Sequence, residues 1–248
     1  MLLTLRSLVF PTTNSWDEDV FQLTPLGMAL VAALIIILIA LATWLFSRKK
    51  AASSQGTASE QNTTSVKNST KKTAVKQLTF SAMAMALAML LSNVKLLDLF
   101  AGGSATLCSM FFITLIGYFY GTGAGLLTGL AYGLLQFVID PVFYTLPQLL
   151  IDYPLAFGAL GLSGLLRKKK WGLQIGYVVG IVGRLFFSWL SGVLFFASYA
   201  ESYQMLPALY SFYYNGSYIG VEGVITLIII SLPPVRKGLD SIKRMATE

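Results

Sequence analysis

Residues 105–139 read ATLCSMFFITLIGYFYGTGAGLLTGLAYGLLQFVI, a stretch without a charged residue. Two apolar segments, 105–120 and 122–139, meet at a short connection that contains Gly121 and Gly123. Each segment approaches the roughly 20 apolar residues that a membrane-spanning helix needs. A connection this short places consecutive helices side by side and antiparallel. The stretch therefore predicts a helical hairpin within a membrane.

Five more apolar segments flank this hairpin. The first, residues 26–46, has no internal charge, follows the acidic residues 17–19 and precedes the basic residues 48–50. This order predicts an uncleaved anchor with its N-terminus outside, not a cleaved signal peptide. The other four segments comprise residues 76–93, 147–166, 172–197 and 207–232. The predicted fold is an all-α membrane protein, in which a six-helix bundle is preceded by one extra N-terminal transmembrane helix.

The composition excludes several classes of protein. Of the 248 residues, 55% are hydrophobic and 12% are charged, whereas a typical soluble domain is about 45–50% apolar and about 25% charged. So little charge cannot cover a water-soluble particle of this size, which argues against a soluble enzyme. The chain has no histidine, and its single cysteine is Cys108. It therefore lacks the commonest general base, a common zinc ligand and any intramolecular disulfide. We expect no catalytic residue, metal or cofactor.

The net charge of +7 reflects where the basic residues lie. Fifteen of the 18 lysines and arginines follow the first apolar segment, precede the second, separate the fifth and sixth, or follow the seventh. Seven helices with an external N-terminus bring all fifteen to the cytoplasm, in keeping with the positive-inside rule. The charge is thus a signal of topology in a cell membrane, with a cytoplasmic C-terminus. Nucleic acid is not expected as a partner.

The chain divides into five parts by composition. Residues 1–25 are expected outside the cell, before the anchor at 26–46. Residues 47–75 are rich in Ser, Thr, Asn and Gln and lack large apolar clusters, which predicts a flexible cytoplasmic linker. Residues 76–235 form the predicted six-helix membrane domain, and residues 236–248 form a basic cytoplasmic tail.

Three ionisable residues fall inside the predicted helices, where charge is costly and often functional. Arg184 and Glu222 lie in the last two helices, and Asp152 lies near the external start of the fifth. One interpretation is structural, with Arg184 paired to Glu222 or to Asp152. The other is that Asp152, with aromatic neighbours such as Tyr144 and Tyr153, serves as a ligand carboxylate.

The external half of the last two helices, residues 186–218, is rich in aromatic side chains. An interfacial aromatic belt accounts for many of them, but it accounts less well for Asn215 followed by Gly216. Aromatic faces with one carboxylate and one amide suit a flat, cationic heteroaromatic ligand, through stacking and cation–π attraction. A belt and a ligand pocket both remain as interpretations.

Residues 81–88, SAMAMALA, carry two overlapping pairs of small residues, Ala82 with Ala86 and Ala84 with Ala88. Such pairs let another helix approach closely in lipid, either within the bundle or on a partner. No GxxxxGK[ST] sequence is present, so the chain encodes no phosphate-binding loop of an ATPase.

Several long stretches carry a resemblance to a known family: QLLIDYPLAFGALGLSGLL (148–166), GRLFFSWLSGVLFFASYAESYQM (183–205) and YSFYYNGSY (210–218), with FAGGSATLCSM (100–110) in support. From about residue 76 onward, the chain resembles the thiamine-specific ThiT family, the substrate-binding (S) components of energy-coupling factor (ECF) importers. The resemblance implies a six-helix protein that binds thiamine from outside. It also implies partners in the lipid bilayer, namely a transmembrane coupling protein (the T component) and two ABC-type ATPase subunits.

The resemblance assigns roles to particular residues. The family's ligand carboxylate, a Glu in some members, corresponds to Asp152, which is followed by the matching Tyr153. The Tyr and Asn of the last helix correspond to Tyr210 and Asn215, and a Gly in the preceding helix corresponds to Gly192. The family's AxxxA docking pattern falls on Ala82 and Ala86, which favours the partner interpretation of that pair.

A few positions differ from relatives that stack the ligand between a His and a Trp. Those positions are Ser188 and Phe196 here, and Tyr132 stands where such members have a further Trp. Without a histidine, one aromatic face comes from another residue, such as Trp189 or a tyrosine. Tyr144 is included among the expected ligand-binding residues.

The resulting hypothesis has residues 93–104 as a lid over the site. Asp152 accepts hydrogen bonds or charge from thiamine, Tyr210 and Asn215 orient it, and Phe196 and Tyr153 supply aromatic faces. The alternatives are another vitamin or a thiamine precursor within the same class and, less favoured, a standalone secondary carrier, which would normally show inverted repeats or broken paired helices. A membrane enzyme would need a nucleophile–base pair or metal ligands that the sequence does not offer.

Overall fold

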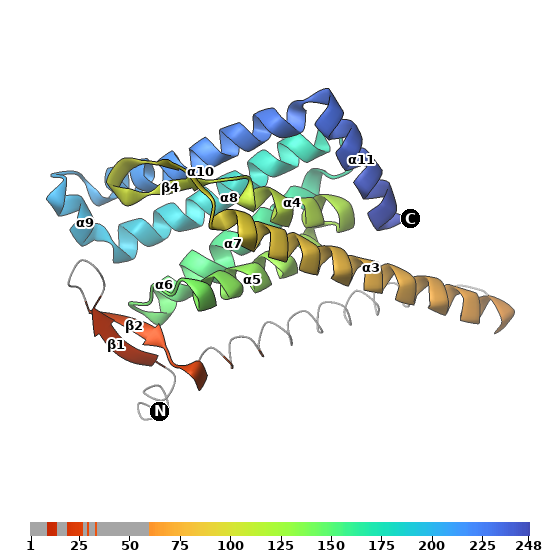
Figure 1. The fold of residues 1–248 in the computed structure, drawn as a ribbon, viewed down its shortest axis with the longest axis horizontal. Coiled ribbons are helices and arrows are strands. Elements are labelled where there is room, and N and C mark those ends of the chain that lie inside the picture. Colours follow the sequence, from red (N-terminus) through yellow and green to blue (C-terminus); the bar gives the residue numbers. More distant parts are fainter. Residues whose placement is uncertain (1–8, 14–18, 27–28, 30–32, 34–59) are drawn as a thin grey trace.

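The computed structural model describes residues 9–13, 19–26, 29, 33 and 60–248. The predicted anchor at 26–46 therefore lies almost entirely outside the described residues. From residue 60 onward the chain is mostly helical, as predicted, and its helices pack into a bundle (Figure 1). Its helical elements are α3 (Glu60–Ser92), η1 (Phe100–Gly102), α4 (Ser109–Tyr120), α5 (Thr122–Ile139), α6 (Leu146–Leu150), η2 (Ile151–Leu155), α7 (Ala156–Gly158), η3 (Ala159–Leu166), α8 (Gly172–Phe195), α9 (Ala197–Ser202), α10 (Pro207–Ser231) and α11 (Pro233–Thr247).

Two small antiparallel hairpins add to this helical architecture. Strands β1 (Val9–Thr13) and β2 (Asp19–Leu23) pair in the N-terminal segment. Strands β3 (Lys95–Asp98) and β4 (Ser104–Thr106) pair between α3 and α4. The second hairpin occupies the predicted lid segment, so this connection has a defined structure, and β4 packs against α10.

Five of the described helical segments are long and apolar enough to cross a membrane: residues 73–92, 122–139, 146–166, 172–195 and 207–231. A further apolar helix, α4, is shorter. It begins later than predicted because the preceding residues pair in β4, and Cys108 then adopts a left-handed φ of 54°. The predicted hairpin of α4 and α5 is confirmed. It turns at Gly121, whose φ of 101° favours glycine.

A glycine face on α5 determines how the central helices pack. Gly125, Gly129 and Gly133 follow each other at a spacing of four. A Cβ on Gly129 would lie 2.4 Å from the backbone oxygen of Phe157, and a Cβ on Gly133 would lie 2.3 Å from that of Tyr153. Without side chains, α5 contacts the backbone of η2 and α7 directly, as small residues allow in membrane helices.

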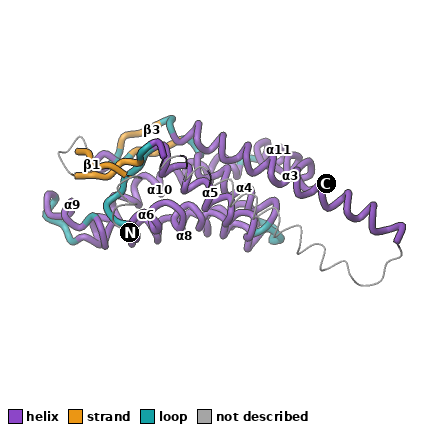
Figure 2. Tube along the Cα trace, turned by 90° about the horizontal axis from the view of Figure 1, so that it is seen from below, coloured by secondary structure: helices purple, strands orange, loops and turns teal. Residues whose placement is uncertain are grey.

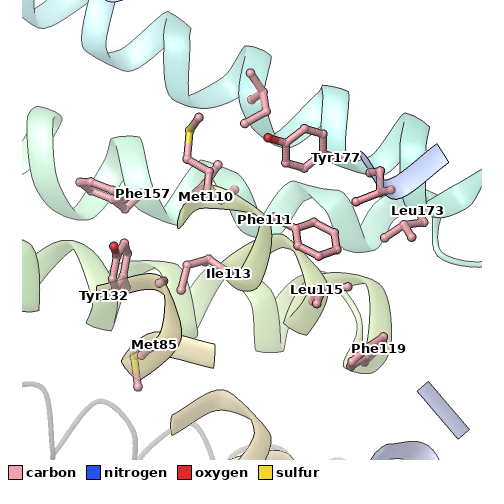
Figure 3. Packing of buried hydrophobic residues seen from close by; sticks show 14 of the residues in the cluster. Met85, Met110, Phe111, Ile113, Leu115, Phe119, Tyr132, Phe157, Leu173 and Tyr177 are labelled. Atoms are coloured by element: carbon pink, nitrogen blue, oxygen red, sulfur yellow. The ribbon is translucent and has the colours of Figure 1, made fainter. Parts of the chain in front are cut away.

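The hydrophobic core lies between α4, α5, α7 and α8. Met110 and Ile113 of α4 belong to the same buried cluster as Tyr132 of α5, Phe157 of α7 and Tyr177 of α8 (Figure 3). The Tyr132 and Phe157 rings meet edge to face, with centroids 5.1 Å apart. This core gives η2 and α8, which carry the candidate site, a rigid support.

The predicted linker is shorter than its composition indicates. Helix α3 begins at Glu60, so residues 60–75, which the composition assigns to the linker, are helical. The first part of α3 extends beyond the bundle (Figure 2). Extending an existing helix adds one hydrogen bond per residue fixed, whereas an isolated peptide must first nucleate. Polar composition therefore underestimates helix in a segment joined to a membrane helix.

The predicted basic tail forms helix α11 up to Thr247, which folds back across one end of the bundle (Figure 1). The Arg236 guanidinium lies 4.6 Å from the Trp171 ring centroid. The hydroxyl of Tyr120 donates to the backbone oxygen of Ala246 at 3.0 Å. We call this end, with Lys76, residues 167–170 and the basic residues of α11, the basic end.

Candidate functional site

The candidate site begins at helix α6, and the residue before this helix caps its N-terminus. Thr145 is the N-cap, and its hydroxyl accepts a hydrogen bond from the backbone N–H of Gln148 at 3.3 Å. Pro147 lies in the first turn, where its missing N–H has no cost. The Gln148 side-chain oxygen accepts from the N–H of Tyr144 at 3.1 Å. The Thr-x-x-Gln sequence is that of a capping box, but Gln148 here binds the N–H of the residue before the N-cap, and the two bonds together fix the start of the helix.

Asp152 lies one turn further along, in the π-helical element η2. Pro154 within this element has no N–H to donate, so the regular helical bonding is interrupted and the turn widens. The Asp152 carboxylate is half-buried and accepts a hydrogen bond from the side-chain amide of Gln148 at 2.7 Å. The buried Ser191 hydroxyl of α8 lies near this carboxylate but makes no hydrogen bond with the described residues.

One group of aromatic side chains, the Tyr144 cluster, consists of Tyr144, Phe196 and Tyr199. The Tyr144 and Phe196 ring centroids are 5.4 Å apart at 87°, and those of Phe196 and Tyr199 are 6.1 Å apart. The hydroxyls of Tyr144 and Tyr199 are 3.3 Å apart. The structure thus brings Phe196 together with Tyr144, which follows from the edge-to-face preference of aromatic rings.

A second group, the tyrosine row, extends from α9 along α10 and consists of Tyr203, Tyr210, Tyr214 and Tyr218. Successive ring centroids are 5.3, 6.1 and 5.6 Å apart. The rings of Tyr210 and Tyr214 are nearly parallel, at 10°. Tyr214 and Tyr218 lie near Asp152. The carboxylate therefore has aromatic side chains of α10 nearby, and Gln148 also connects it to the backbone of Tyr144.

The β3–β4 hairpin lies against the tyrosine row. The Phe100 ring centroid is 5.2 Å from that of Tyr203 and 6.0 Å from that of Tyr210. A Cβ on Gly103 would lie 3.5 Å from the Tyr218 ring and 3.6 Å from the Tyr214 ring. The segment expected to act as a lid is therefore in contact with the candidate site.

A cavity of about 350 Å³ opens beside this hairpin, lined by Phe100, Met205, Tyr213 and Ser217. No residue expected from the sequence to bind the ligand lines it. The cavity thus lies beside the hairpin and is not lined by the carboxylate.

Asn215 and Gly192 join α8 to α10. The Asn215 amide nitrogen donates to the backbone oxygens of Ser188 at 3.2 Å and Ser211 at 3.0 Å, and its oxygen accepts from the Tyr218 hydroxyl at 2.8 Å. A Cβ on Gly192 would lie 2.1 Å from the Ser211 hydroxyl. Asn215, Gly192 and Ser188 therefore set the distance between the two helices and hold Tyr218 in place.

Three aromatic residues expected to face the ligand are engaged elsewhere. The Tyr153 hydroxyl donates to the backbone oxygen of Asp140 at 2.8 Å and so fixes the connection between α5 and α6. Tyr132 lies in the core, 1% exposed. The indole N–H of Trp189 donates to the backbone oxygen of Ala208 at 3.0 Å. These side chains support the helices around the site.

The predicted pairing of Arg184 with Glu222 or Asp152 is not seen among the described residues. The Arg184 guanidinium lies 4.2 Å from the Phe157 ring centroid. Glu222 accepts hydrogen bonds from the hydroxyls of Thr106 and Ser109 and from the N–H of Met110. Donors from β4 and the first turn of α4 thus satisfy the Glu222 carboxylate. The Arg184 guanidinium lies over the Phe157 ring.

The two pairs of small residues lie on different faces of helix α3. Ala84 and Ala88 are buried, and Ala84 packs with Ile116 of α4. Ala82 and Ala86 are exposed on the opposite face. One pair thus serves packing within the bundle, and the other remains available at the surface.

The sequence reasoning missed two polar residues next to Asp152, Gln148 and Ser191. The Thr-x-x-Gln capping box before an apolar run was a readable signal for Gln148. The sequence analysis also did not single out Tyr214. A tyrosine recurs every four residues at Tyr210, Tyr214 and Tyr218, so these side chains share one helix face. No local pattern indicates Ser191, because only the packing of α8 against η2 brings it to the carboxylate.

The fold and the site define a multi-pass membrane protein with an aromatic, carboxylate-bearing site at one end of its bundle. Residues 78–239 match the family model described as thiamine transporter protein (Thia_YuaJ). The chain belongs to this family, whose members are transporters and not enzymes.

Individual relatives agree with this assignment. The chain is 36% identical over 146 residues to the thiamine transporter ThiT of Bacillus subtilis (strain 168), covering 53% of this chain and 74% of the relative. The solved structure of ThiT from Listeria monocytogenes matches with a TM-score of 0.53 and 27% identity, over 64% of this chain and 94% of that one.

Proposed function

We propose that this protein is the thiamine-binding subunit of an ATP-driven ECF importer, which captures thiamine outside the cell. The observation that carries the proposal is the half-buried carboxylate of Asp152, which Gln148 connects to the Tyr144 cluster and which lies near Tyr214 and Tyr218 of the tyrosine row. Thiamine is a flat heteroaromatic cation, so aromatic faces stack on its rings and its charge compensates the carboxylate. Membership of the thiamine transporter family supports this ligand over other vitamins.

Each expected site residue has a part in this proposal. Asp152 accepts hydrogen bonds or charge from the ligand, Phe196 and Tyr144 provide one aromatic face, and Tyr210 provides the other. The remaining expected residues act through packing: Asn215, Gly192 and Ser188 set the spacing of α8 and α10, and Tyr132 and Tyr153 hold α5 and η2 behind the carboxylate.

Partner subunits supply the energy in this proposal, because the chain contains no phosphate-binding loop. The exposed Ala82 and Ala86 on α3 allow a helix of the T component to approach closely. Exposed apolar side chains surround them, including Leu87 and Leu90 at 41% and 67%. Two ABC-type ATPase subunits act on that component from the cytoplasm.

The orientation follows from the charges. Helix α10 starts beside the tyrosine row and ends at α11, so the candidate site and the basic end are at opposite ends of the bundle (Figure 1). The positive-inside rule places the basic end in the cytoplasm. The site then faces outward, with the C-terminus inside.

Calorimetry on the purified protein tests the ligand. We expect thiamine to bind, and Asp152→Ala to weaken binding by more than tenfold because it removes the carboxylate. Asp240→Ala, which changes an exposed carboxylate on α11, is the matched control and keeps wild-type affinity. Unchanged binding in Asp152→Ala, or binding of riboflavin or biotin in place of thiamine, would contradict the assignment.

Reconstitution tests the coupling. Proteoliposomes with the T component and both ATPase subunits are expected to take up thiamine only with ATP. Uptake by this chain alone would instead show a standalone carrier.

A further inference from the structure

Gln148 is a fully enclosed polar residue beside the candidate site. Its side chain is 0% exposed, yet it carries an amide with two donors and an acceptor. The amide nitrogen donates to the Asp152 carboxylate at 2.7 Å and to the backbone oxygen of Val142 at 3.1 Å. The amide oxygen accepts from the N–H of Tyr144 at 3.1 Å. A buried amide with both ends bonded is held in one rotamer, because any rotation leaves groups unpaired.

The two backbone partners determine which way the amide points. The N–H of Tyr144 can only donate and the C=O of Val142 can only accept, so the amide oxygen faces Tyr144 and the nitrogen faces Val142. The group directed at Asp152 is consequently an N–H donor. It holds one carboxylate oxygen in place and thereby sets the direction of the other.

The same amide connects the carboxylate to an aromatic face. Tyr144, whose N–H it binds, packs its ring on Phe196 at 5.4 Å. A change at Gln148 therefore disturbs the direction of the carboxylate and the backbone that carries the Tyr144 ring. The bond that Gln148 makes to the chain before α6 at Tyr144 needs only the amide oxygen, so the bond from the nitrogen to Asp152 exceeds what starting α6 requires.

We propose that Gln148 is a positioning residue of the ligand site, which aligns the Asp152 carboxylate with the Tyr144 cluster. This rests on the proposed function, since the carboxylate is taken to contact thiamine. Gln148 itself touches no ligand. Its contribution to affinity passes through Asp152.

A double-mutant cycle tests this dependence. Gln148→Met keeps the length of the side chain and removes both ends of the amide. In the wild-type background, we expect it to weaken thiamine binding at least tenfold by calorimetry or fluorescence titration. In the Asp152→Ala background, the same change is expected to weaken binding less than threefold, because the carboxylate it aligned is gone. Gln148→Glu, which keeps the capping acceptor but places a second carboxylate against Asp152, replaces Gln148→Met if that variant does not fold.

The outcomes separate this inference from the proposed function. A similar loss of affinity in both backgrounds would show that Gln148 only supports the helix, and unchanged affinity in the wild-type background would show no role; either result overturns the inference. In both cases thiamine would still bind the wild-type protein and depend on Asp152. If the wild-type protein bound no thiamine, the proposed function itself would fail.

Discussion

The carboxylate of Glu222 on α10 accepts a hydrogen bond from the backbone N–H of Met110 in the first turn of α4, at 3.0 Å. The Ser109 hydroxyl donates to it at 3.0 Å, and Thr106 of β4 donates as well. The first N–H groups of a helix have no partner within it, and the helix dipole favours negative charge there. This buried acid therefore ties the base of the β3–β4 hairpin and the start of α4 to the helix that carries the tyrosine row.

Replacing Glu222 is expected to destabilise the protein. Glu222→Ala leaves the hydroxyls of Thr106 and Ser109 and the N–H of Met110 without their acceptor, at a cost of about 2–4 kcal/mol in the free energy of unfolding. We expect the midpoint of thermal unfolding to fall clearly, and less so for Glu222→Gln, which retains one acceptor oxygen. The exposed Glu201→Ala serves as the control, and an equal midpoint for Glu201→Ala and Glu222→Ala would refute the role of Glu222.

Adding a methyl group at Gly192 is expected to separate α8 from α10. The new Cβ would lie 2.1 Å from the Ser211 hydroxyl and 3.4 Å from the Asn215 amide nitrogen. Gly192→Ala should lower the unfolding midpoint by several degrees and weaken thiamine binding at least tenfold, since both site helices move. Gly216→Ala is the matched control on α10, because nothing lies within 4 Å of its Cβ position; equal effects of the two changes would show that close packing at Gly192 is not needed.

Removing the aromatic contact of the hairpin is expected to speed ligand release. Phe100→Ala deletes the ring that packs on Tyr203 and Tyr210, so a lid over the site would open more easily. Stopped-flow fluorescence should show a severalfold higher dissociation rate for thiamine. Leu97→Ala, a truncation of an exposed side chain on the same hairpin, is expected to leave the rate unchanged. Identical rates for Phe100→Ala and the wild type would exclude a lid held at this position.

Bulky residues on the two faces of α3 are expected to act differently. Ala82→Trp changes an exposed position, so thiamine binding should persist while ATP-driven uptake falls more than tenfold. Ala84→Trp changes a buried position and should prevent stable folding through overpacking. Uptake and calorimetry on each variant distinguish the two. Full uptake by Ala82→Trp would mean that the T component docks elsewhere.

The sequence predicted the helical segments well because their signal is local. Charge-free apolar runs and the glycines at 121 and 123 define the α4–α5 hairpin regardless of the rest of the chain. The start of α3 was misjudged, because the polar residues after Glu60 continue a helix that begins in the membrane segment. Asp152 is predicted as a site residue by its position in an apolar helix, since a charge there is rare enough to be informative.

Hydropathy, charge and short motifs were enough to predict the class of protein, the order of its membrane helices and the residues from which a site could be built. The contacts that those residues make came from the folded structure. The Asn215 amide joins α10 to α8, and the Tyr153 hydroxyl holds the connection between α5 and α6. Ala82 and Ala84 lie on opposite faces of α3. The reason is physical: hydropathy depends on each residue and its neighbours in the chain, whereas a hydrogen bond such as that from the Asn215 amide to the backbone oxygen of Ser188 depends on which distant backbone groups packing brings to the side chain.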